Sequence, residues 1–377
     1  MNINDIHVSI RLIRTEKSWM EGLAIDQLRT AASRPGIELA VGLPDLHPGK
    51  GLPVGAAMLS RGVIYPAFIG NDVGCGMAFQ QCELKVRKLK RDRLARRLTE
   101  MAATKGKLAP EAPEQWAVAH GYEFGGMTEG LGSIGGGNHF AELLELEKVL
   151  DPETWDSLNL DPQMLFLLVH CGSRGHGEKL YRDQSAVSGA DALRDDSEAA
   201  QNYLARHQIL LRWAETNRAV IGAGMLEMLG ADGRLILDNC HNSITPIAAD
   251  DGTILRLHRK GAAAADRGPV LIAGSRGAFS YLVVPVGDQS GNAFSLAHGA
   301  GRKWNRQSAR GRLETRYSAD ALRQTPLHSL VICPDKALLY EEAPEVYKNI
   351  DQVIADLESH HLIRVAAKFR PLLTFKP

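Results

Sequence analysis

Residues 41–80 read VGLPDLHPGKGLPVGAAMLSRGVIYPAFIGNDVGCGMAFQ, and this stretch decides the fold class. Short apolar runs, several of them β-branched, are interrupted there by glycine and proline. Such a pattern is typical of strands joined by tight loops and is unfavourable for helices. The stretch therefore predicts a β-rich core.

Helices and further strands are expected on both sides of this stretch. Hydrophobic periodicity predicts a short strand within residues 1–40, and helices over 17–32, 84–101, 141–150, 197–229 and 341–358. Strands are expected over 164–170, 234–242, 253–258, 270–273 and 281–286. The chain shows no internal repeat and no low-complexity linker. We therefore expect a mixed α/β (α+β) fold in which residues 1–377 form one large domain, with a β-rich core and peripheral helices.

Composition excludes several classes of protein. The 377 residues are 44% hydrophobic and 23% charged, which is ordinary for a globular protein and rules out wholesale disorder, collagen and coiled coils. Lys+Arg and Asp+Glu both number 44, so contact with nucleic acid must come from a local patch. Eight of residues 85–97 are Lys or Arg, which fits a solvated helix face or a contact with the RNA backbone.

The cellular compartment can also be inferred. The chain has no apolar run of 18 residues and no signal-peptide pattern, so we expect no membrane association. Its five cysteines are odd in number and widely spaced, which argues against a disulfide framework and for a reducing compartment. The expected localisation is cytoplasmic.

Five side chains of metal-ligating type lie in loops and at strand ends. They are Asp72 and Cys75 in GNDVGCGM, His139 in GGGNHF, His170 in LVHCGSRG and His241 in NCHN. Carboxylate, thiolate and imidazole together suit Zn²⁺ or Mn²⁺, and a thiolate can bridge two ions. Each residue alone also has an ordinary explanation, because buried cysteines and strand-end histidines are common in cores. The spacing leaves both interpretations open.

The usual nucleotide-binding motifs are missing. The chain contains no G-x-x-x-x-G-K-[ST] and no G-x-G-x-x-G between a strand and a helix, which argues against a P-loop NTPase or a Rossmann dehydrogenase. Glycine-rich loops that carry Lys50, Arg174 and Lys260 still fit anion binding. His298, in SLAHGAGRKWNR, has small neighbours and a cation nearby, so it is either a phosphoryl acceptor or a packed loop histidine.

Taken together and in order, ten segments resemble the RtcB family of RNA ligases. They are GLPDLHPGKGLPVGA (42–56), GNDVGCGM (70–77), GSIGGGNHFAE (132–142), LVHCGSRGHG (168–177), HN (241–242), RKGA (259–262), LIAGSRGAFSYLV (271–283), SLAHGAGR (295–302), EEAPEVYKNID (341–351) and RPLLTFK (370–376). The resemblance runs from about residue 40 to the end. It implies a GTP- and Mn²⁺-dependent ligase that joins RNA 2′,3′-cyclic phosphate or 3′-phosphate ends to 5′-hydroxyl ends. It also implies that the single large domain has a central cleft that holds metal.

The resemblance also implies roles for particular residues. Two Mn²⁺ ions are expected on Asp72, Cys75, His139, His170 and His241, with Cys75 bridging. His298 is expected to attack the α-phosphorus of GTP and become guanylylated. The nucleotide-binding set is expected to be Asn138 on phosphate, Glu142 on the guanine edge, Lys376 on the guanylate, and Ser275 and Arg302. Lys50, Arg174 and Lys260 are expected to contact RNA.

The sequence departs from the family pattern at three places. Arg276 replaces the usual Met in GSRG, GAGRKWNR lacks the usual GAGR-x-M-S-R ending, and the tail reads FKP instead of VKG. The chain is also compact and resembles the divergent branch associated with a peptide release factor homologue. That likeness implies repair of broken ribosomal RNA, with the release-factor homologue or the ribosome as partner.

Two other functions fit the same residues. A metal-dependent phosphoesterase could act on RNA cyclic phosphate ends without joining them, and it would not need His298. A non-catalytic factor could bind RNA or the ribosome through residues 85–97, and its binding would survive removal of metal but weaken steeply with salt.

Overall fold

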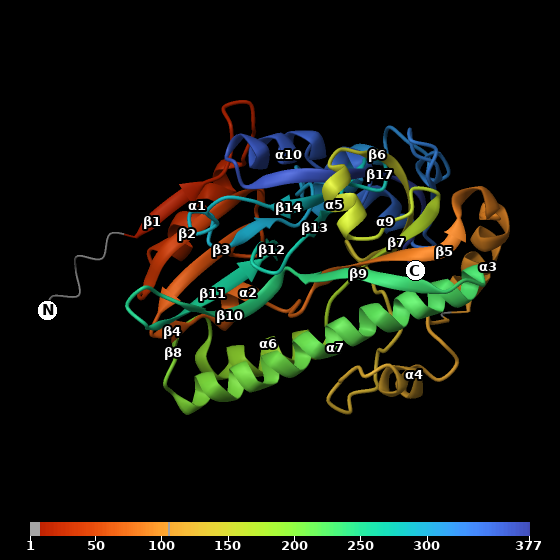
Figure 1. Ribbon diagram of the computed structural model, residues 1–377. Helices are drawn as coiled ribbons and strands as arrows, with labels where there is room; N and C mark the ends of the chain where they lie inside the picture. Colours follow the sequence, from red (N-terminus) through yellow and green to blue (C-terminus); the bar gives the residue numbers. More distant parts are fainter. Residues whose placement is uncertain (1–7, 105) are drawn as a thin grey trace, which may run out of the picture.

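A computed structural model describes residues 8–104 and 106–377 (Figure 1). The larger of its two main sheets has eight strands in the order β13-β14-β17-β6-β7-β5-β9, with β16 paired to β17. The bounds of these strands are β5 Gly76–Lys85, β6 Phe140–Val149, β7 Met164–Cys171, β9 Gly233–Cys240, β13 Val270–Ile272, β14 Ser280–Pro285, β16 Leu330–Ile332 and β17 Ile363–Phe375. Most neighbouring strands in this sheet are antiparallel.

The second sheet has five strands in the order β1-β2-β3-β11-β10. Their bounds are β1 Ser9–Leu12, β2 Ile37–His47, β3 Val54–Arg61, β10 Asn242–Ala248 and β11 Ile254–Lys260. Two short ladders complete the β structure: β12 (Ala262–Ala264) with β15 (Ser295–Ala297), and β4 (Val63–Ile64) with β8 (Leu193–Arg194). β9 leads directly into β10, so one chain segment passes from the first sheet to the second.

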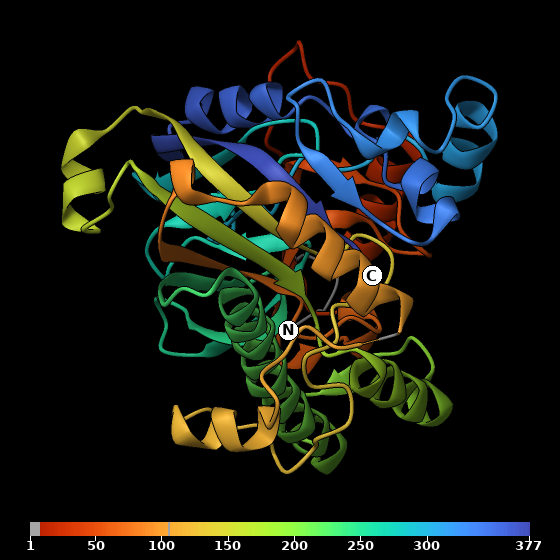
Figure 2. The same cartoon turned by 90° about the vertical axis from the view of Figure 1, so that its right-hand side faces the viewer.

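Helices surround the sheets. Their bounds are α1 Gly22–Ala32, α2 Pro66–Ile69, α3 Arg91–Ala103, α4 Pro113–Ala119, α5 Pro152–Ser157, α6 Gly175–Ser188, α7 Glu198–Leu229, α8 Arg306–Leu313, α9 Lys336–Glu341 and α10 Ile350–Ser359, with 3-10 turns at Val86–Lys88, Ala321–Arg323 and Pro344–Val346. The long α7 runs beneath the sheets in Figure 1, and α3 lies in front of the large sheet in Figure 2. The side chain of Ser197 caps the start of α7, and Gly230 ends the helix in the left-handed conformation.

The main apolar clusters lie between these layers. One joins β2 to α10, with Val41, Leu43 and Leu357 all fully buried. Another lies under α3 and α7, where Leu98 and Ile221 pack on the large sheet. The expected mixed α/β fold with a β-rich core and peripheral helices is confirmed, while its extent as one domain over residues 1–377 stays a prediction.

Several expected elements are confirmed with small shifts of their ends. The strands expected at 164–170, 234–242, 253–258, 270–273 and 281–286 are β7, β9, β11, β13 and β14, and the helix expected at 197–229 is α7. The helix expected at 17–32 begins only at Gly22, because Ser18 is bonded to Asp356 outside the helix.

Three helical predictions are wrong in whole or in part. Residues 141–150 form β6, because this segment pairs with β17 on one side and β7 on the other. Residues 84–90 are the end of β5 and a 3-10 turn, and α3 begins at Arg91. Residues 341–358 are split between α9 and α10, and between them the chain passes Pro344. Sheet pairing and proline override the helical pattern in these segments.

Candidate active site

The register of the large sheet gathers the predicted metal-ligating residues at one edge. Gly76, the first residue of β5, lies opposite Cys171 of β7 and Cys240 of β9, and Phe140 of β6 lies opposite His170. The residues at or next to these pairs must therefore lie close together. They are Cys75, His139, His170 and His241.

Five side chains form a compact, largely buried cluster there. Cys75 Sγ lies 3.3 Å from His139 Nε2 and 3.2 Å from His170 Nε2. His170 Nε2 lies 3.3 Å from His241 Nε2, and His139 Nε2 lies 3.3 Å from Asp72 Oδ2. Two groups result, Cys75–His170–His241 and Asp72–Cys75–His139, each with its ligand atoms within 4.8 Å of one another, and Cys75 belongs to both.

The electrostatics of the cluster fit bound cations. Burial, together with the nearby Asp72 carboxylate, raises the pKa of Cys75 well above its ordinary value. Burial and the neighbouring histidines hold the pKa values of His170 and His241 well below the usual range, which keeps both rings neutral and able to ligate. A divalent ion among these donors would favour the thiolate of Cys75, and one carboxylate, one thiolate and three imidazoles match Mn²⁺ or Zn²⁺.

Two local features hold the cluster in shape. A Cβ added at Gly172 would lie 2.1 Å from Asp72 Oδ1, so only glycine lets the two loops approach this closely. The buried Arg218 of α7 forms an ion pair with Asp238 and donates to the carbonyl oxygens of Gly74 and Cys171, at 2.7 and 2.9 Å. All three guanidinium nitrogens of Arg218 have hydrogen-bond partners, so the buried charge is compensated. Through these bonds the side chain links α7 to the loops that carry the ligands.

His298 follows β15 and faces the same cluster. Its ring centroid lies 4.7 Å from that of His241. The next residue, Gly299, bridges to Ala273 beyond β13, which fixes the turn. The fully buried Asp45 of β2 places its Oδ2 atom 2.6 Å from His298 Nδ1 and 3.2 Å from the His298 backbone nitrogen.

Asp45 was not among the residues singled out from the sequence. The signal was present, because GLPDLH places a lone carboxylate within an otherwise apolar strand. A buried carboxylate usually needs a specific partner, but the sequence does not show that the partner is a histidine about 250 residues away.

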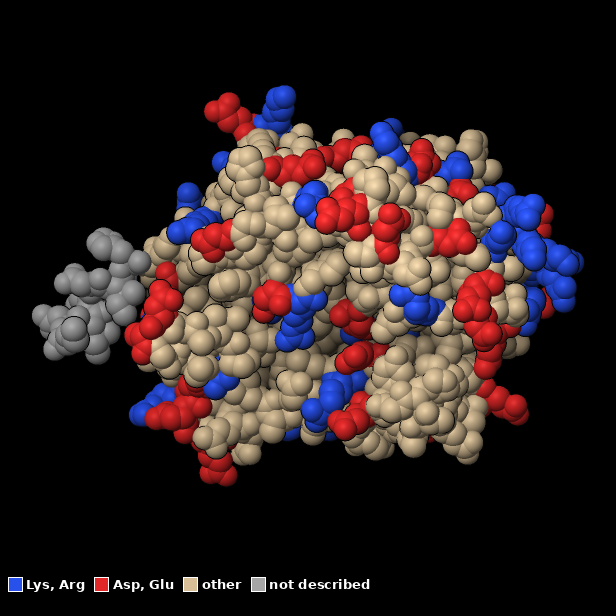
Figure 3. All heavy atoms as spheres, in the orientation of Figure 1, with Lys and Arg blue, Asp and Glu red and all other residues tan. Residues whose placement is uncertain are grey.

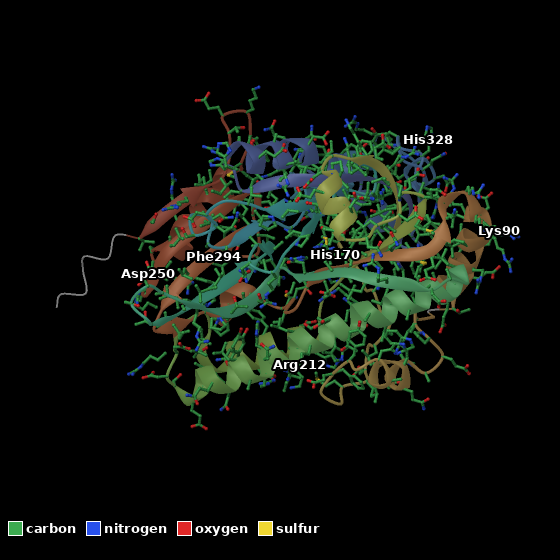
Figure 4. All side chains as sticks on the ribbon, in the orientation of Figure 1. Lys90, His170, Arg212, Asp250, Phe294 and His328 are labelled. Atoms are coloured by element: carbon green, nitrogen blue, oxygen red, sulfur yellow. The ribbon has the colours of Figure 1, made fainter. Side chains whose placement is uncertain are left out.

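A cavity of about 1600 Å³ opens over the cluster and His298. Figure 4 labels His170 near the middle of the view, and this side chain is buried. All five predicted nucleotide-binding residues line the cavity: Asn138, Glu142, Ser275, Arg302 and Lys376. The expected central cleft is thus present, and one space contains the candidate nucleophile and most of the candidate ligands.

Glu142 and Lys376 form a buried polar wall. Burial raises the pKa of Glu142 to about 7, although Thr374 donates to its carboxylate and Lys376 lies near. Burial lowers the pKa of Lys376 to about 8, and its Nζ donates to the His139 carbonyl oxygen at 2.9 Å. Although the tail departs from the family pattern, Lys376 still lines the cavity. It does so because β17 carries the chain across the large sheet as far as Phe375.

Arg302 differs from the others in its bonding. Its guanidinium donates to Glu342 at 3.0 Å and to the carbonyl oxygens of Trp304 and Glu341, so all three nitrogens have protein partners. Arg276, at the unusual GSRG position, also lines the cavity and donates to the Leu339 carbonyl oxygen at 2.7 Å. Both cations hold the 333–347 segment against the cavity wall.

The three predicted RNA-contacting cations occupy different places. Lys50 is exposed at the rim of the cavity, and Lys260 lies in its wall, where burial lowers the lysine pKa to about 8. Arg174 instead reaches the metal-type cluster from outside the cavity lining, with its Nη1 atom 3.3 Å from His139 Nδ1. The structure therefore groups Lys50 and Lys260 with the cavity and separates Arg174 from them.

None of the helices in the described part of the chain is both long and apolar enough to cross a bilayer.

Comparison with known proteins identifies the family. The family model described as "tRNA-splicing ligase RtcB" matches residues 27–118 and 103–377. The chain is 42% identical to "RNA-splicing ligase RtcB2" of Escherichia coli, over 99% of this chain and 97% of that protein. It is also 29% identical to "tRNA-splicing ligase RtcB" of Archaeoglobus fulgidus, over 94% and 91%, and 27% identical to the protein of the same name from Thermococcus kodakarensis, over 92% and 90%. With the fold, the donor cluster and the His298 site in place, these matches show that the chain belongs to the RtcB family of RNA-splicing ligases.

Proposed function

We propose that this protein joins RNA ends bearing a 2′,3′-cyclic phosphate or 3′-phosphate to 5′-hydroxyl ends, using GTP and Mn²⁺. The observation that carries the proposal is the common cavity of His298 and four of the five clustered donors, with Asp45 fixed on the Nδ1 side of the His298 ring. That contact leaves Nε2 as the nitrogen free to attack, which is what a covalent histidine intermediate needs.

Asp72, Cys75, His139, His170 and His241 are proposed to hold two Mn²⁺ ions, with Cys75 shared between them. The two overlapping donor groups support this assignment. When bound, the ions supply charge neutralisation for the phosphates of both substrates.

His298 is proposed to carry the first chemical step. Its Nε2 attacks the α-phosphorus of GTP, a P–N bond forms, and the bond to pyrophosphate breaks. The Asp45 carboxylate stabilises the positive charge that the ring acquires. A terminal 3′-phosphate oxygen of the RNA then attacks the same phosphorus, the P–N bond breaks, and His298 is released. The 5′-hydroxyl finally attacks the RNA 3′-phosphorus and GMP departs. A cyclic phosphate must first be opened by water.

The nucleotide is proposed to lie along the wall formed by Asn138, Glu142, Ser275, Arg302 and Lys376. A Glu142 carboxylate can accept from the N–H groups of guanine, and Lys376 can donate to the guanylate. The internal hydrogen bonds of Arg302 support a role in shaping the wall next to Tyr347, whose ring centroid lies 5.5 Å from the guanidinium carbon.

RNA is proposed to contact Lys50 and Lys260. Arg174 is proposed to hold the His139 ring in place. The basic segment of residues 85–97 supports a second RNA contact. Lys and Arg side chains gather at the α3 end of the molecule in Figure 3. Such a patch suits the phosphate backbone of a large RNA, and we propose cytoplasmic repair of ribosomal RNA with the ribosome or a release-factor homologue as partner.

The decisive experiment uses GTP labelled at the α-phosphate. With Mn²⁺, the wild type should retain an acid-labile label through denaturing electrophoresis, while His298→Ala should retain none. His120→Ala, which removes an exposed histidine at the end of α4, should label like the wild type. A wild type that opens cyclic phosphates but never labels would instead be the phosphoesterase, and RNA binding without either reaction would indicate a non-catalytic factor.

A further inference from the structure

An aromatic side chain at the cavity rim has no role in the chemistry proposed above. Trp19 lines the cavity that contains His298, yet its ring is 54% exposed. Leu23, also on the rim, is 55% exposed. We call Trp19, Leu23 and Lys50 the tryptophan rim. Two large apolar side chains exposed at the mouth of the same cavity make the rim a candidate binding surface.

The loop that carries Trp19 is held firmly on both sides. Before it, the Thr15 backbone nitrogen and Oγ1 donate to Asp356 Oδ1 at 3.2 and 2.7 Å, and Ser18 donates to the other oxygen of that carboxylate. After it, Met20 is buried in an apolar cluster. The loop stands above α10 at the upper left of Figure 1. Trp19 is therefore presented by a fixed backbone, which lowers the entropic cost of binding a partner.

One cation near Trp19 is linked to the reaction centre. Lys348 Nζ lies 6.0 Å from the Trp19 ring centroid and donates to the carbonyl oxygens of Pro44 and Leu46, at 3.0 and 2.6 Å. These carbonyls flank Asp45, the partner of His298. One lysine thus joins the exposed ring to the segment that positions the nucleophile.

The backbone next to Lys50, the cation of the tryptophan rim, is anchored. Gln27, one helical turn after Leu23 on α1, exchanges two hydrogen bonds with Gly49, at 3.0 and 3.1 Å. Lys50 follows this anchor, is exposed and lines the cavity. Glu21 adds one carboxylate to the rim, so a phosphate group is favoured on the Lys50 side.

We propose that Trp19 stacks on an unpaired base of the RNA substrate next to the end being joined, while Lys50 contacts the adjoining phosphate. This inference rests on the proposed function in taking RNA as the substrate. The cavity exceeds the roughly 300–1,000 Å³ of a small-molecule site, which leaves room for an RNA strand beside a nucleotide. A rigid aromatic face with a neighbouring cation is the arrangement that binds single-stranded nucleic acid without regard to sequence.

The test measures binding of a labelled single-stranded RNA with a 3′-phosphate to the full-length protein at fixed salt. Trp19→Ala should weaken binding about 30-fold, the middle of the range for loss of one stacked base, whereas Trp19→Phe should keep most of the affinity. Trp116→Ala is the matched control, because Trp116 stacks on His120 at α4 and does not line the cavity.

A series of RNAs, each with one abasic nucleotide, locates the contact. At one position near the 3′ end, loss of the base should weaken binding to the wild type and leave binding to Trp19→Ala unchanged. Identical abasic profiles for the two proteins, or equal affinity of Trp19→Ala and Trp116→Ala, would overturn the inference.

The guanylylation assay separates this inference from the proposed function. Labelling of His298 by GTP involves no RNA, so Trp19→Ala should label at the wild-type rate. If the wild type fails to label while Trp19→Ala still loses RNA affinity, the ligase mechanism fails and the stacking contact stands. A wild type that binds no RNA contradicts both.

Discussion

The Oδ2 atom of Asp45 lies 2.6 Å from Nδ1 of His298, across the junction of a strand from the five-stranded sheet and a turn after β15. Asp45 is fully buried, and its carboxylate also contacts the His298 backbone nitrogen. Asp45 therefore lies on the Nδ1 side of the His298 ring, and His298 lines the cavity. This contact links the strand pattern of residues 41–80 to the chemistry of the site.

We expect Asp45→Asn to slow labelling of His298 by about 100-fold, because a misoriented reacting group loses roughly that factor. Asparagine keeps the size of the side chain and can still accept from the His298 backbone N–H, so the fold should persist. The measurement is the rate of label incorporation from GTP at saturating Mn²⁺. An unchanged rate would show that Asp45 has no positioning role, and Asp288→Asn, at an exposed loop, is the control.

The number of metal ions bound per protein should show whether two ions share Cys75. Cys75→Ala removes a donor from both groups and should lower binding at both, whereas His241→Ala should leave the Asp72–Cys75–His139 group intact. Elemental analysis after dialysis against Mn²⁺ measures the stoichiometry. Cys82→Ala, a buried cysteine in an apolar cluster, should bind metal like the wild type. Equal losses in the Cys75 and His241 variants would contradict a bridging cysteine.

Binding of GTP should depend on the protonation of Glu142. Burial raises its pKa to about 7, and only the carboxylate accepts two guanine N–H groups. Affinity should therefore fall by about tenfold from about pH 8 to about pH 6, one unit on either side of that pKa. Glu142→Gln should bind weakly at both pH values and lose this part of the pH dependence. A variant with the same pH profile as the wild type would assign the titration to another group.

The basic segment should contribute a salt-dependent share of RNA affinity. Arg93 and Arg96 are exposed on α3 and point away from the buried Leu94 and Leu98. Reversing both to Glu should weaken RNA binding and reduce the slope of log affinity against log salt by about 1.4, because each phosphate of a single strand that is no longer neutralised lowers the slope by about 0.7. Labelling by GTP should be unaffected. If Arg194→Glu, elsewhere on the surface, has the same effect, the segment has no special part in RNA binding.

Acid should destabilise the fold through two buried histidines outside the site. Burial lowers the pKa of His207 to about 3 and of His258 to about 4. Each ring accepts a backbone N–H, from Ile244 and Tyr65 respectively. Below about pH 6.5 the unfolded state binds protons that the folded state does not, so stability should fall from that pH towards pH 4.

Urea unfolding across this pH range measures the effect. For His258 alone, the loss should be on the order of 3 kcal/mol, and His258→Gln should flatten the curve. A free energy of unfolding that stays constant down to about pH 4.5 would show that these rings do not drive acid unfolding.

The local sequence predicted much of the fold. The Gly- and Pro-broken runs of 41–80 did give strands, and the periodicity of 197–229 did give α7, because a helix that begins at a serine cap and ends at a left-handed glycine is defined by nearby residues. Residues 141–150 form a strand, although their hydrophobic pattern predicted a helix. Their leucines are buried on both faces of a central strand, and that environment exists only once β17 and β7 flank it.

The residues of the candidate site also divide into those that the sequence predicted and those that only the structure revealed. Asp72, Cys75, His139, His170, His241 and His298 could be named from short motifs and from resemblance to the family, because each sits in a small-residue loop with a distinctive order. The sequence did not reveal Asp45, the Lys376 contact with His139, or Trp19 at the rim. Their partners lie far away along the chain, and no local pattern encodes a contact of that kind.

Residue types and short motifs were thus enough to predict the kinds of donor, the strand-rich core and the family. The contacts of the folded chain were needed to show which donors lie within reach of one another, on which side of the His298 ring Asp45 lies and which buried groups have shifted pKa values. The physical reason is that residue type and local spacing fix chemistry and short-range conformation, whereas distances and burial arise from sheet register between distant segments.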